Sequence, residues 1–335
     1  MSYNDKVNLS VWLFTRGYTS YFPNAILVCK MNIWDKYKAI NESLKKEFLC
    51  VPPYRSVTPQ YICDCYDKLQ KEGDCSGYIV RSINLPWERA YQMEYRYKQC
   101  DIFQDFIPAI EMALYDYSIG NWLCAYLTLL PMVEALIRKL TKNKIVTDKK
   151  RIYMSDYIQC FLDEYEYASH AYYNDKRAPI KEAYLEYLAY ILKETLFDNF
   201  DSYYEKNYEV VFNRNITLHK MEGIEDESKV SRNITRLFLL LDIFAEAWML
   251  QDARLYNRNT LEIDPHSDLD FQVRFKLYVY LCTKAVGPCD IHYVYNALRG
   301  SCGWKFPEEE KKRLISQLEI QTEIYQKMPL KKSGA

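Results

Sequence analysis

The sequence predicts an all-α protein, and three observations lead to that prediction. Apolar residues recur every three or four positions through most of the chain, which is the period of an amphipathic helix. Glycine, which interrupts helices, is scarce, with nine in 335 residues. Proline, glycine and asparagine gather between the periodic stretches, as is typical of helix ends. One short apolar run, residues 25–29, leaves a small sheet as an open alternative.

Residues 1–94 are expected to form a mostly helical N-terminal region. Its first predicted helix covers residues 34–48, where apolar side chains follow the helical period. Thr58 and Pro59 predict the start of the next helix, because threonine is a good N-cap and proline fits the first helical position. That helix is expected to end at two glycines, Gly73 and Gly77.

Residues 95–255 are expected to form the central helical domain. A first helix is predicted over residues 100–118, followed by a turn at Gly120-Asn121 and a second helix over residues 122–140. The residues of the second helix that are predicted to face inward are Leu123, Tyr126, Leu127, Leu130, Val133, Leu136, Ile137 and Leu140. Two antiparallel helices joined by a tight turn form an αα-hairpin. Pro131 lies inside the second helix and is expected to kink it.

The rest of this domain alternates polar and helical stretches. Residues 141–180 are interpreted as an insertion that contains a short helix over 155–165. A further helix is predicted over residues 181–197, and the Asp-, Asn- and Tyr-rich stretch 198–207 is predicted to be a loop. A strongly apolar helix over residues 231–251 then closes the bundle.

Residues 256–335 are expected to form a C-terminal helical extension. Its predicted helices cover residues 268–284, 290–299 and 307–328. The last of these alternates glutamate and lysine around a few leucines and isoleucines, which is typical of an amphipathic surface helix. We find no internal repeat and no nucleotide-binding fingerprint along the chain.

Composition and charge limit where the protein works and what it binds. The net charge is −1, so any affinity for nucleic acid must come from a local cluster or a groove between two copies. No secretory signal and no run of 18 apolar residues is present, so we expect a cytoplasmic protein without a membrane contact. The 11 cysteines lack the paired spacing of a zinc site, and we expect neither a metal nor a cofactor.

The stretch from Arg214 to His219 carries the most chemistry. Arginine offers a planar fork of donors that fits phosphate oxygens, and histidine moves protons near neutral pH. In a helix, Asn215 and His219 share a face, whereas Arg214 lies about 140° from His219 around the axis. One chain therefore aims both groups at one atom only if the helix begins near Arg214. Otherwise a second copy completes the site.

This Arg-polar-x3-His pattern resembles the ribonuclease motif of the HEPN superfamily, over roughly residues 95–252. The Gly120-Asn121 turn and the helix after it also resemble the start of a HEPN bundle. The resemblance implies a HEPN-type antiparallel bundle that cleaves RNA without a metal, with Arg214, Asn215 and His219 as catalytic residues. It further implies a homodimer, a role as a toxin or anti-phage defence effector, and an antitoxin or regulatory protein as a further partner.

Several interpretations stay open beside this one. One alternative is a non-catalytic HEPN-like scaffold. Another is an unrelated helical structural or adaptor protein, in which Arg214 is a solvated helix-end charge and His219 a partly buried core residue. Glu134, within an apolar helix, is expected either to be paired in the core or to point into a cleft. Three tyrosines upstream of the motif are expected to pack, with base stacking as the alternative: Tyr203, Tyr204 and Tyr208. If RNA is the substrate, its phosphates are expected to contact the densest basic run first, and the alternative is that this run is a solvated loop between helices. The run consists of Lys142, Lys144, Lys149, Lys150 and Arg151.

Overall fold

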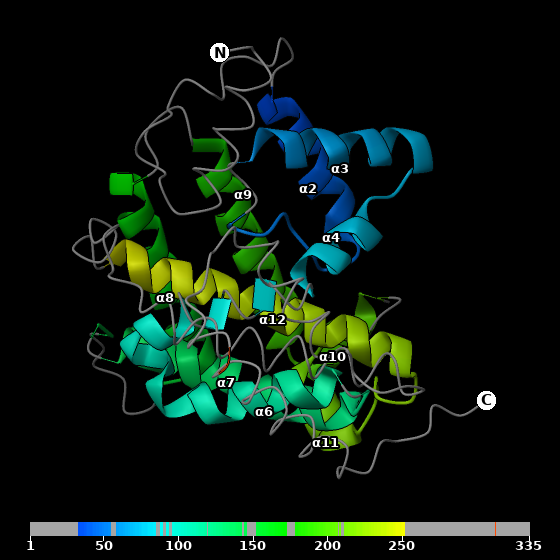
Figure 1. The fold of residues 1–335 in the computed structure, drawn as a ribbon. Helices are drawn as coiled ribbons and strands as arrows, with labels where there is room; N and C mark the ends of the chain where they lie inside the picture. Colours follow the sequence, from blue (N-terminus) through cyan, green and yellow to red (C-terminus); the bar gives the residue numbers. More distant parts are fainter. Residues whose placement is uncertain are drawn as a thin grey trace.

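The computed structural model describes residues 33–251, apart from short gaps, together with Lys312. The gaps fall at residues 55–57, 85–87, 90–91, 94–95, 119, 143, 146–151, 173–177, 207 and 209–210. Within these described residues the regular elements are helices and no strand occurs, which confirms the all-α prediction (Figure 1). The run at residues 25–29 and the predicted C-terminal extension, residues 256–335, lie outside the described part, Lys312 excepted.

The described part of the N-terminal region contains the helices α2 (Ile33–Lys45), α3 (Pro59–Glu72) and α4 (Ser76–Ile83). As predicted, Thr58 occupies the N-cap position of α3 and Pro59 its first turn. Gly73 ends α3 in the left-handed conformation (φ 72°), which glycine adopts without strain. Gly77, however, lies inside α4, so the prediction that it ends a helix is wrong. Cys75 occupies the N-cap position of α4, and the carboxylate of Asp74 before it accepts from the backbone N–H and the hydroxyl of Ser76 (2.9 and 2.7 Å), so α4 starts just before Gly77.

The predicted hairpin is present as α6 (Ile107–Ser118) and α7 (Trp122–Thr141), which pack against each other. Gly120 adopts a positive φ of 79° in the turn between them. The stretch before α6 is less regular than predicted, because Asp101–Phe106 forms a 3₁₀ segment, η3, after the shorter η2 (Tyr97–Gln99). Pro108 accounts for the change, since proline is tolerated in the first turn of an α-helix but not in its interior.

Helix α7 buries a continuous stripe toward α6 and α12. The prediction that Leu123 faces inward is wrong, because 41% of its surface is exposed. The buried stripe begins two residues later, at Ala125 and Tyr126. Farther along, Leu127 is half-buried, and the other predicted core positions are buried: Leu130, Val133, Leu136, Ile137 and Leu140.

The stretch interpreted as an insertion contributes to the core. Its helix α8 (Met154–Tyr172) is longer than the predicted 155–165 and packs against α7 and α12. Phe161 of α8 meets Phe244 edge to face, with ring centroids 5.2 Å apart. Partner helices on both sides bury this face, and packing of this kind stabilises helices more than their local sequence does.

The next helix is predicted correctly in position, and the loop after it is not. Helix α9 (Ala178–Ala189) continues into a π-helical segment, η5 (Tyr190–Leu196). Residues 198–207, predicted as a loop, contain a short helix, α10 (Phe200–Glu205). The side chain of Asn199 caps α10 by accepting from the backbone N–H of Ser202 (2.8 Å). The asparagine and aspartate residues that suggested a loop act here as a helix start.

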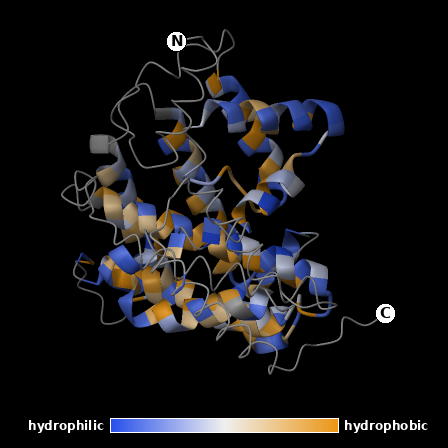
Figure 2. Ribbon diagram, in the orientation of Figure 1, coloured by the Kyte–Doolittle hydropathy of each residue, from blue (hydrophilic) through white to orange (hydrophobic). Residues whose placement is uncertain are grey.

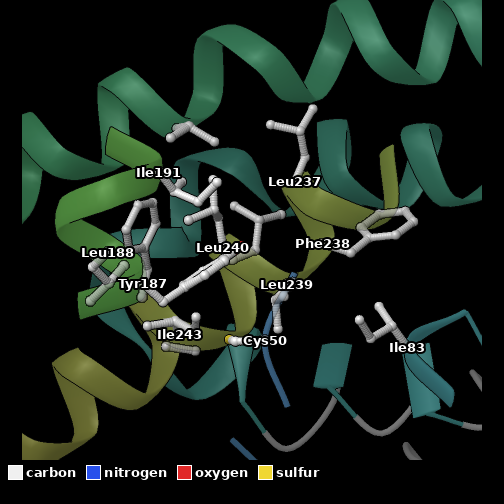
Figure 3. Packing of buried hydrophobic residues seen from close by; sticks show 14 of the residues in the cluster. Cys50, Ile83, Tyr187, Leu188, Ile191, Leu237, Phe238, Leu239, Leu240 and Ile243 are labelled. Atoms are coloured by element: carbon white, nitrogen blue, oxygen red, sulfur yellow. The ribbon is translucent and has the colours of Figure 1, made fainter. Parts of the chain in front are cut away.

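Helix α12 (Glu227–Gln251) lies between the N-terminal helices and the α6–α7 pair (Figure 1). Its apolar residues meet Cys50, Ile83 and residues of α9 and η5, as Figure 3 shows. Hydrophobic and hydrophilic residues alternate along most helices, as expected for a packed bundle (Figure 2). One buried cluster therefore contains residues from both sides of the predicted boundary at residue 94, and the division into domains remains a prediction.

Buried polar residues on α12 join it to the N-terminal region. Asp242 pairs with Arg89, with 2.7 Å between Oδ2 and Nη2 and both side chains 1% exposed. Arg236 donates to the backbone carbonyl of Glu47 (2.8 Å) and lies over the rings of Phe48 and Phe212. Burial lowers the pKa of Arg236 to about 10. These contacts fix the N-terminal helices against the helix that closes the bundle.

Candidate functional site

The motif forms a short helix of its own, α11 (Arg214–Lys220). Asn213 precedes it in an extended conformation, and its side-chain oxygen accepts from the backbone N–H groups of Asn215 and Ile216 (2.9 and 3.1 Å). Asparagine is among the best N-cap residues, because its side chain replaces the hydrogen bonds missing at a helix start. The helix therefore begins at Arg214.

Buried hydrogen bonds hold the segment that leads into α11. The amide nitrogen of Asn213 donates to the backbone carbonyls of Thr195 and Asp198 (2.6 and 3.0 Å). The backbone N–H of Phe212 donates to the hydroxyl of Tyr203 (2.8 Å), and burial raises the pKa of Tyr203 to about 12. Asn233 of α12 donates to the carbonyl of Val211 (2.9 Å). The start of the motif is thereby tied to η5, α10 and α12.

Arg214 lies at the surface of α7, where an acidic side chain holds it. Its Nη2 is 3.1 Å from Oε2 of Glu134, and its Nη1 donates to the side-chain oxygen of Asn215 (3.0 Å). The Arg214 side chain is 28% exposed, so solvent reaches part of the guanidinium. Its Nε is buried and has no hydrogen-bond partner among the described residues. The guanidinium is therefore oriented by the protein while some of its donor capacity remains unused.

Glu134 connects Arg214 to a second arginine. Its Oε1 accepts from Nε and Nη2 of Arg138 (3.0 and 2.8 Å), one turn along α7, while Oε2 faces Arg214. The guanidinium of Arg138 also lies over the ring of Tyr157, 4.5 Å from its centroid. Glu134 was expected either to be paired in the core or to point into a cleft. It is paired, but its side chain is 21% exposed and is therefore not enclosed in the core.

His219 occupies the opposite end of α11 and is exposed. Its ring meets Phe200 of α10 edge to face, with centroids 6.5 Å apart and planes at 74°. The alternative that His219 is a core residue is therefore wrong. The structure brings Arg214 to Glu134 and His219 to Phe200, so the two motif side chains are held by different neighbours.

The three tyrosines upstream of the motif have separate environments. Tyr203 is buried and Tyr208 is half-buried, and both belong to a cluster of rings that includes Tyr190. Packing is confirmed for these two. Tyr204 differs, because it is 41% exposed and its hydroxyl donates to the carboxylate of Glu222 (2.6 Å).

The described part of the basic run offers few free cations. Lys142 is exposed at the C-terminal end of α7. Lys144 pairs with Glu164 of α8, with 2.5 Å between Nζ and Oε2. Three members of the run lie outside the described residues: Lys149, Lys150 and Arg151. Because Lys144 is paired with Glu164 of α8, it is a weaker candidate for phosphate binding than its place in the basic run suggested.

Two further features of the described residues concern metal binding and membrane insertion. Among them, no group of three or more histidine, cysteine, aspartate or glutamate side chains is placed to hold a metal ion. No disulfide joins Cys63, Cys65 or Cys75. None of the helices in the described part is both long enough and apolar enough to cross a membrane.

Comparison with known proteins adds no relative. No family model matches the chain. No curated protein and no solved structure matches it either.

Two parts of this site were missed from the sequence. Asn213 is not among the site residues predicted from the sequence, although an asparagine directly before a helix signals an N-cap. Phe200 was placed in a loop, because its helix has only six residues and no visible periodicity. The first could have been found by the capping rule, whereas the second depended on tertiary packing.

Proposed function

We propose that this protein is a metal-independent endoribonuclease of the kind that the Arg-polar-x3-His resemblance implies. One observation carries the proposal: a partly buried, oriented arginine and an exposed histidine stand on one capped helix that begins at the arginine. Arg214 supplies a fixed cation for a phosphate, and His219 supplies an accessible proton carrier. The ion pair with Glu134 and the buried cap at Asn213 fix the position of this arginine.

The reaction transfers protons and exchanges one phosphorus–oxygen bond for another. The imidazole of His219 takes the proton of a ribose 2′-OH, and the 2′-oxygen forms a bond to the adjacent phosphorus. The bond from phosphorus to the 5′-oxygen breaks, and that oxygen takes a proton from a general acid. The products are a 2′,3′-cyclic phosphate and a 5′-hydroxyl. Arg214 stabilises the extra negative charge that the phosphorane carries in the transition state.

Asn215 and Glu134 act on this arginine. Asn215 contacts Nη1 of Arg214, so its role is to orient the guanidinium. Glu134 holds Nη2 and shares its charge with Arg138, which limits how tightly it retains Arg214. A phosphate that approaches the exposed part of Arg214 therefore meets a guanidinium in a fixed orientation.

A homodimer would supply the general acid. Although α11 begins at Arg214, this arginine is held by Glu134 whereas His219 contacts Phe200, so the two side chains of one chain do not share a neighbour. A second copy that faces the first across a two-fold axis would provide a second histidine and a second arginine. Light scattering on the full chain tests this part. A dimer is expected at tens of micromolar protein, whereas a monomer that cleaves RNA would exclude the shared site.

The alternative is a non-catalytic scaffold or helical adaptor that uses the same surface to bind a partner. The exposed His219 and the oriented Arg214 would then contact a protein or a nucleotide without chemistry. If the chain is a toxin or anti-phage effector, an antitoxin or regulatory protein would be such a partner and would cover the motif. Cleavage assays separate the two classes, since a scaffold binds and does not cut.

The decisive experiment measures cleavage of a fluorogenic RNA in EDTA under single-turnover conditions. Wild type is expected to cleave, His219→Ala to lose cleavage, and Arg214→Lys to fail because an ammonium lacks the bidentate fork. Asn215→Ala is expected to be milder. Arg81→Lys, at an exposed arginine of α4, is the matched control, and circular dichroism checks folding. Activity restored only by Mg²⁺, or a fully active His219→Ala variant, would overturn the proposal.

A further inference from the structure

We infer that the ring of Tyr204 is a stacking platform for an unpaired base beside His219, so that the substrate class is single-stranded RNA. This inference rests on the proposed ribonuclease function and specifies which RNA the site takes. It is carried by an aromatic strip, defined as Tyr204, Lys220, Phe200 and His219, which runs along α10 and α11. Each neighbouring pair in the strip is joined by a measured contact.

The ring of Tyr204 is exposed and fixed at the same time. It is 41% exposed on α10, and its hydroxyl donates to the carboxylate of Glu222 (2.6 Å). The ammonium of Lys220 donates to the same hydroxyl (3.4 Å) and lies 4.5 Å from the ring centroid. An exposed ring held by polar contacts loses little conformational freedom when a base stacks on it, which favours binding.

The strip connects this ring to the proposed proton carrier. Lys220 also lies over Phe200, 5.0 Å from its centroid, and Phe200 meets His219 edge to face. Phe200 and Tyr204 stand four positions apart on α10, which places them on one face of that helix. A nucleotide whose scissile phosphate is near His219 therefore has Phe200, Lys220 and Tyr204 next to it in order.

The chemistry of the strip fits an unpaired nucleotide. Aromatic side chains that alternate with cations bind single-stranded nucleic acid, because every base has a π-face and every linkage a phosphate. In a duplex the bases stack on one another and their faces are unavailable to a protein ring. The neighbouring Tyr203 and Tyr208 pack against other rings, which leaves Tyr204 as the member of this group that faces solvent.

The test uses the wild-type chain with a fully 2′-O-methylated single-stranded RNA, which cannot be cleaved because it lacks the attacking hydroxyl. One base is replaced by 2-aminopurine, whose fluorescence falls when it stacks on an aromatic ring. Binding is expected to quench the probe. Tyr204→Leu is expected to remove the quenching and to weaken binding about tenfold, as is typical when a stacked aromatic is lost.

Two variants control the interpretation. Tyr204→Phe keeps the ring and is expected to keep the quenching. Tyr167→Leu removes an 80% exposed tyrosine from α8 and is expected to bind like wild type. A duplex of the same sequence is expected to bind about tenfold more weakly than the single strand.

The outcomes separate this inference from the function on which it rests. Wild-type quenching and affinity in Tyr204→Leu would overturn the stacking platform, even where His219-dependent cleavage stands. Equal cleavage of duplex and single-stranded RNA would also overturn it and leave the ribonuclease proposal intact. A wild-type chain that neither cleaves nor binds RNA would overturn both.

Discussion

Two arginine–carboxylate pairs in this molecule differ in burial, and burial decides whether the arginine stays open to a ligand. Arg89 and Asp242 form a fork, with 3.1 Å between Nη1 and Oδ1 and 2.7 Å between Nη2 and Oδ2, and both are 1% exposed. Tyr97 donates to the same carboxylate (2.5 Å), and Arg89 lies over Phe238. Arg214 and Glu134 share a single contact of 3.1 Å and are 28% and 21% exposed.

The difference lies in what each arginine can still bind. Arg89 is enclosed, and its partners are fixed by three segments of the core, so no ligand replaces them. Arg214 faces solvent on one side, and its carboxylate also serves Arg138, so a phosphate competes for its donors at small cost. A full desolvation penalty makes the buried pair expensive to break, while partial exposure keeps the motif pair available for exchange.

The largest expected effect comes from breaking the buried pair. Asp242→Ala leaves the Arg89 guanidinium charged and unpaired in the core, and the free energy of unfolding is expected to fall by about 3–5 kcal/mol. Urea denaturation followed by circular dichroism measures the change. Glu186→Ala, which removes an exposed partner of Lys45, is the control and is expected to cost less than about 1 kcal/mol. Equal effects of the two variants would contradict the comparison.

Removal of the motif's buried cap is expected to have the next largest effect. Asn213→Ala deletes two accepted and two donated hydrogen bonds, and the loss of a cap together with buried unpaired groups is expected to cost about 2 kcal/mol. Thermal denaturation provides the measurement. Asn199→Ala removes an exposed cap of α10 and is expected to cost about half as much. A smaller loss for Asn213→Ala than for its control would show that α11 is not anchored by this residue.

Weakening the exposed pair is expected to change function more than stability. Glu134→Gln removes a charge from a partly solvated pair, so the free energy of unfolding is expected to change by less than about 1 kcal/mol. The single-turnover cleavage rate is expected to fall about tenfold, because a neutral amide holds Arg214 by a weaker bond. Glu72→Gln, at an exposed pair with Lys68, is the control for both measurements. A Glu134→Gln variant with unchanged cleavage and a large loss of stability would place this pair beside the buried one.

The smallest expected effect is a pH dependence at the start of α12. The hydroxyl and backbone N–H of Ser228 donate to the carboxylate of Asp226, and they hold the pKa of Asp226 below its usual range. A lowered native pKa means that the contribution to stability is present above about pH 4 and is lost as the pH falls through the native pKa. Urea midpoints of wild type and Asp226→Asn are therefore expected to converge between about pH 5 and pH 2. A difference that widens in acid would reverse the assigned sign.

Local signals in the sequence predicted much of the helical framework. The αα-hairpin, the long closing helix and the start of α3 at Pro59 follow from periodicity and helix-end residues, and the structure confirms them. The errors at Gly77, Leu123 and residues 198–207 arose where one turn of helix was decided by a cap or a neighbour. A periodic pattern needs several turns to be recognised, and α10 has fewer than two.

The sequence by itself determined the chemical composition of the candidate site: an arginine, an asparagine and a histidine at helical spacing after a residue that caps helices. Only the tertiary structure decided which of these groups solvent can reach. Glu134 and Arg214 are 80 positions apart and meet because α11 packs against α7, where Thr217 also contacts Tyr126 (3.4 Å). Tyr203 and Tyr204 are adjacent in sequence, yet one is buried and the other exposed. Burial depends on which elements pack together, and a local pattern of residues does not contain that information.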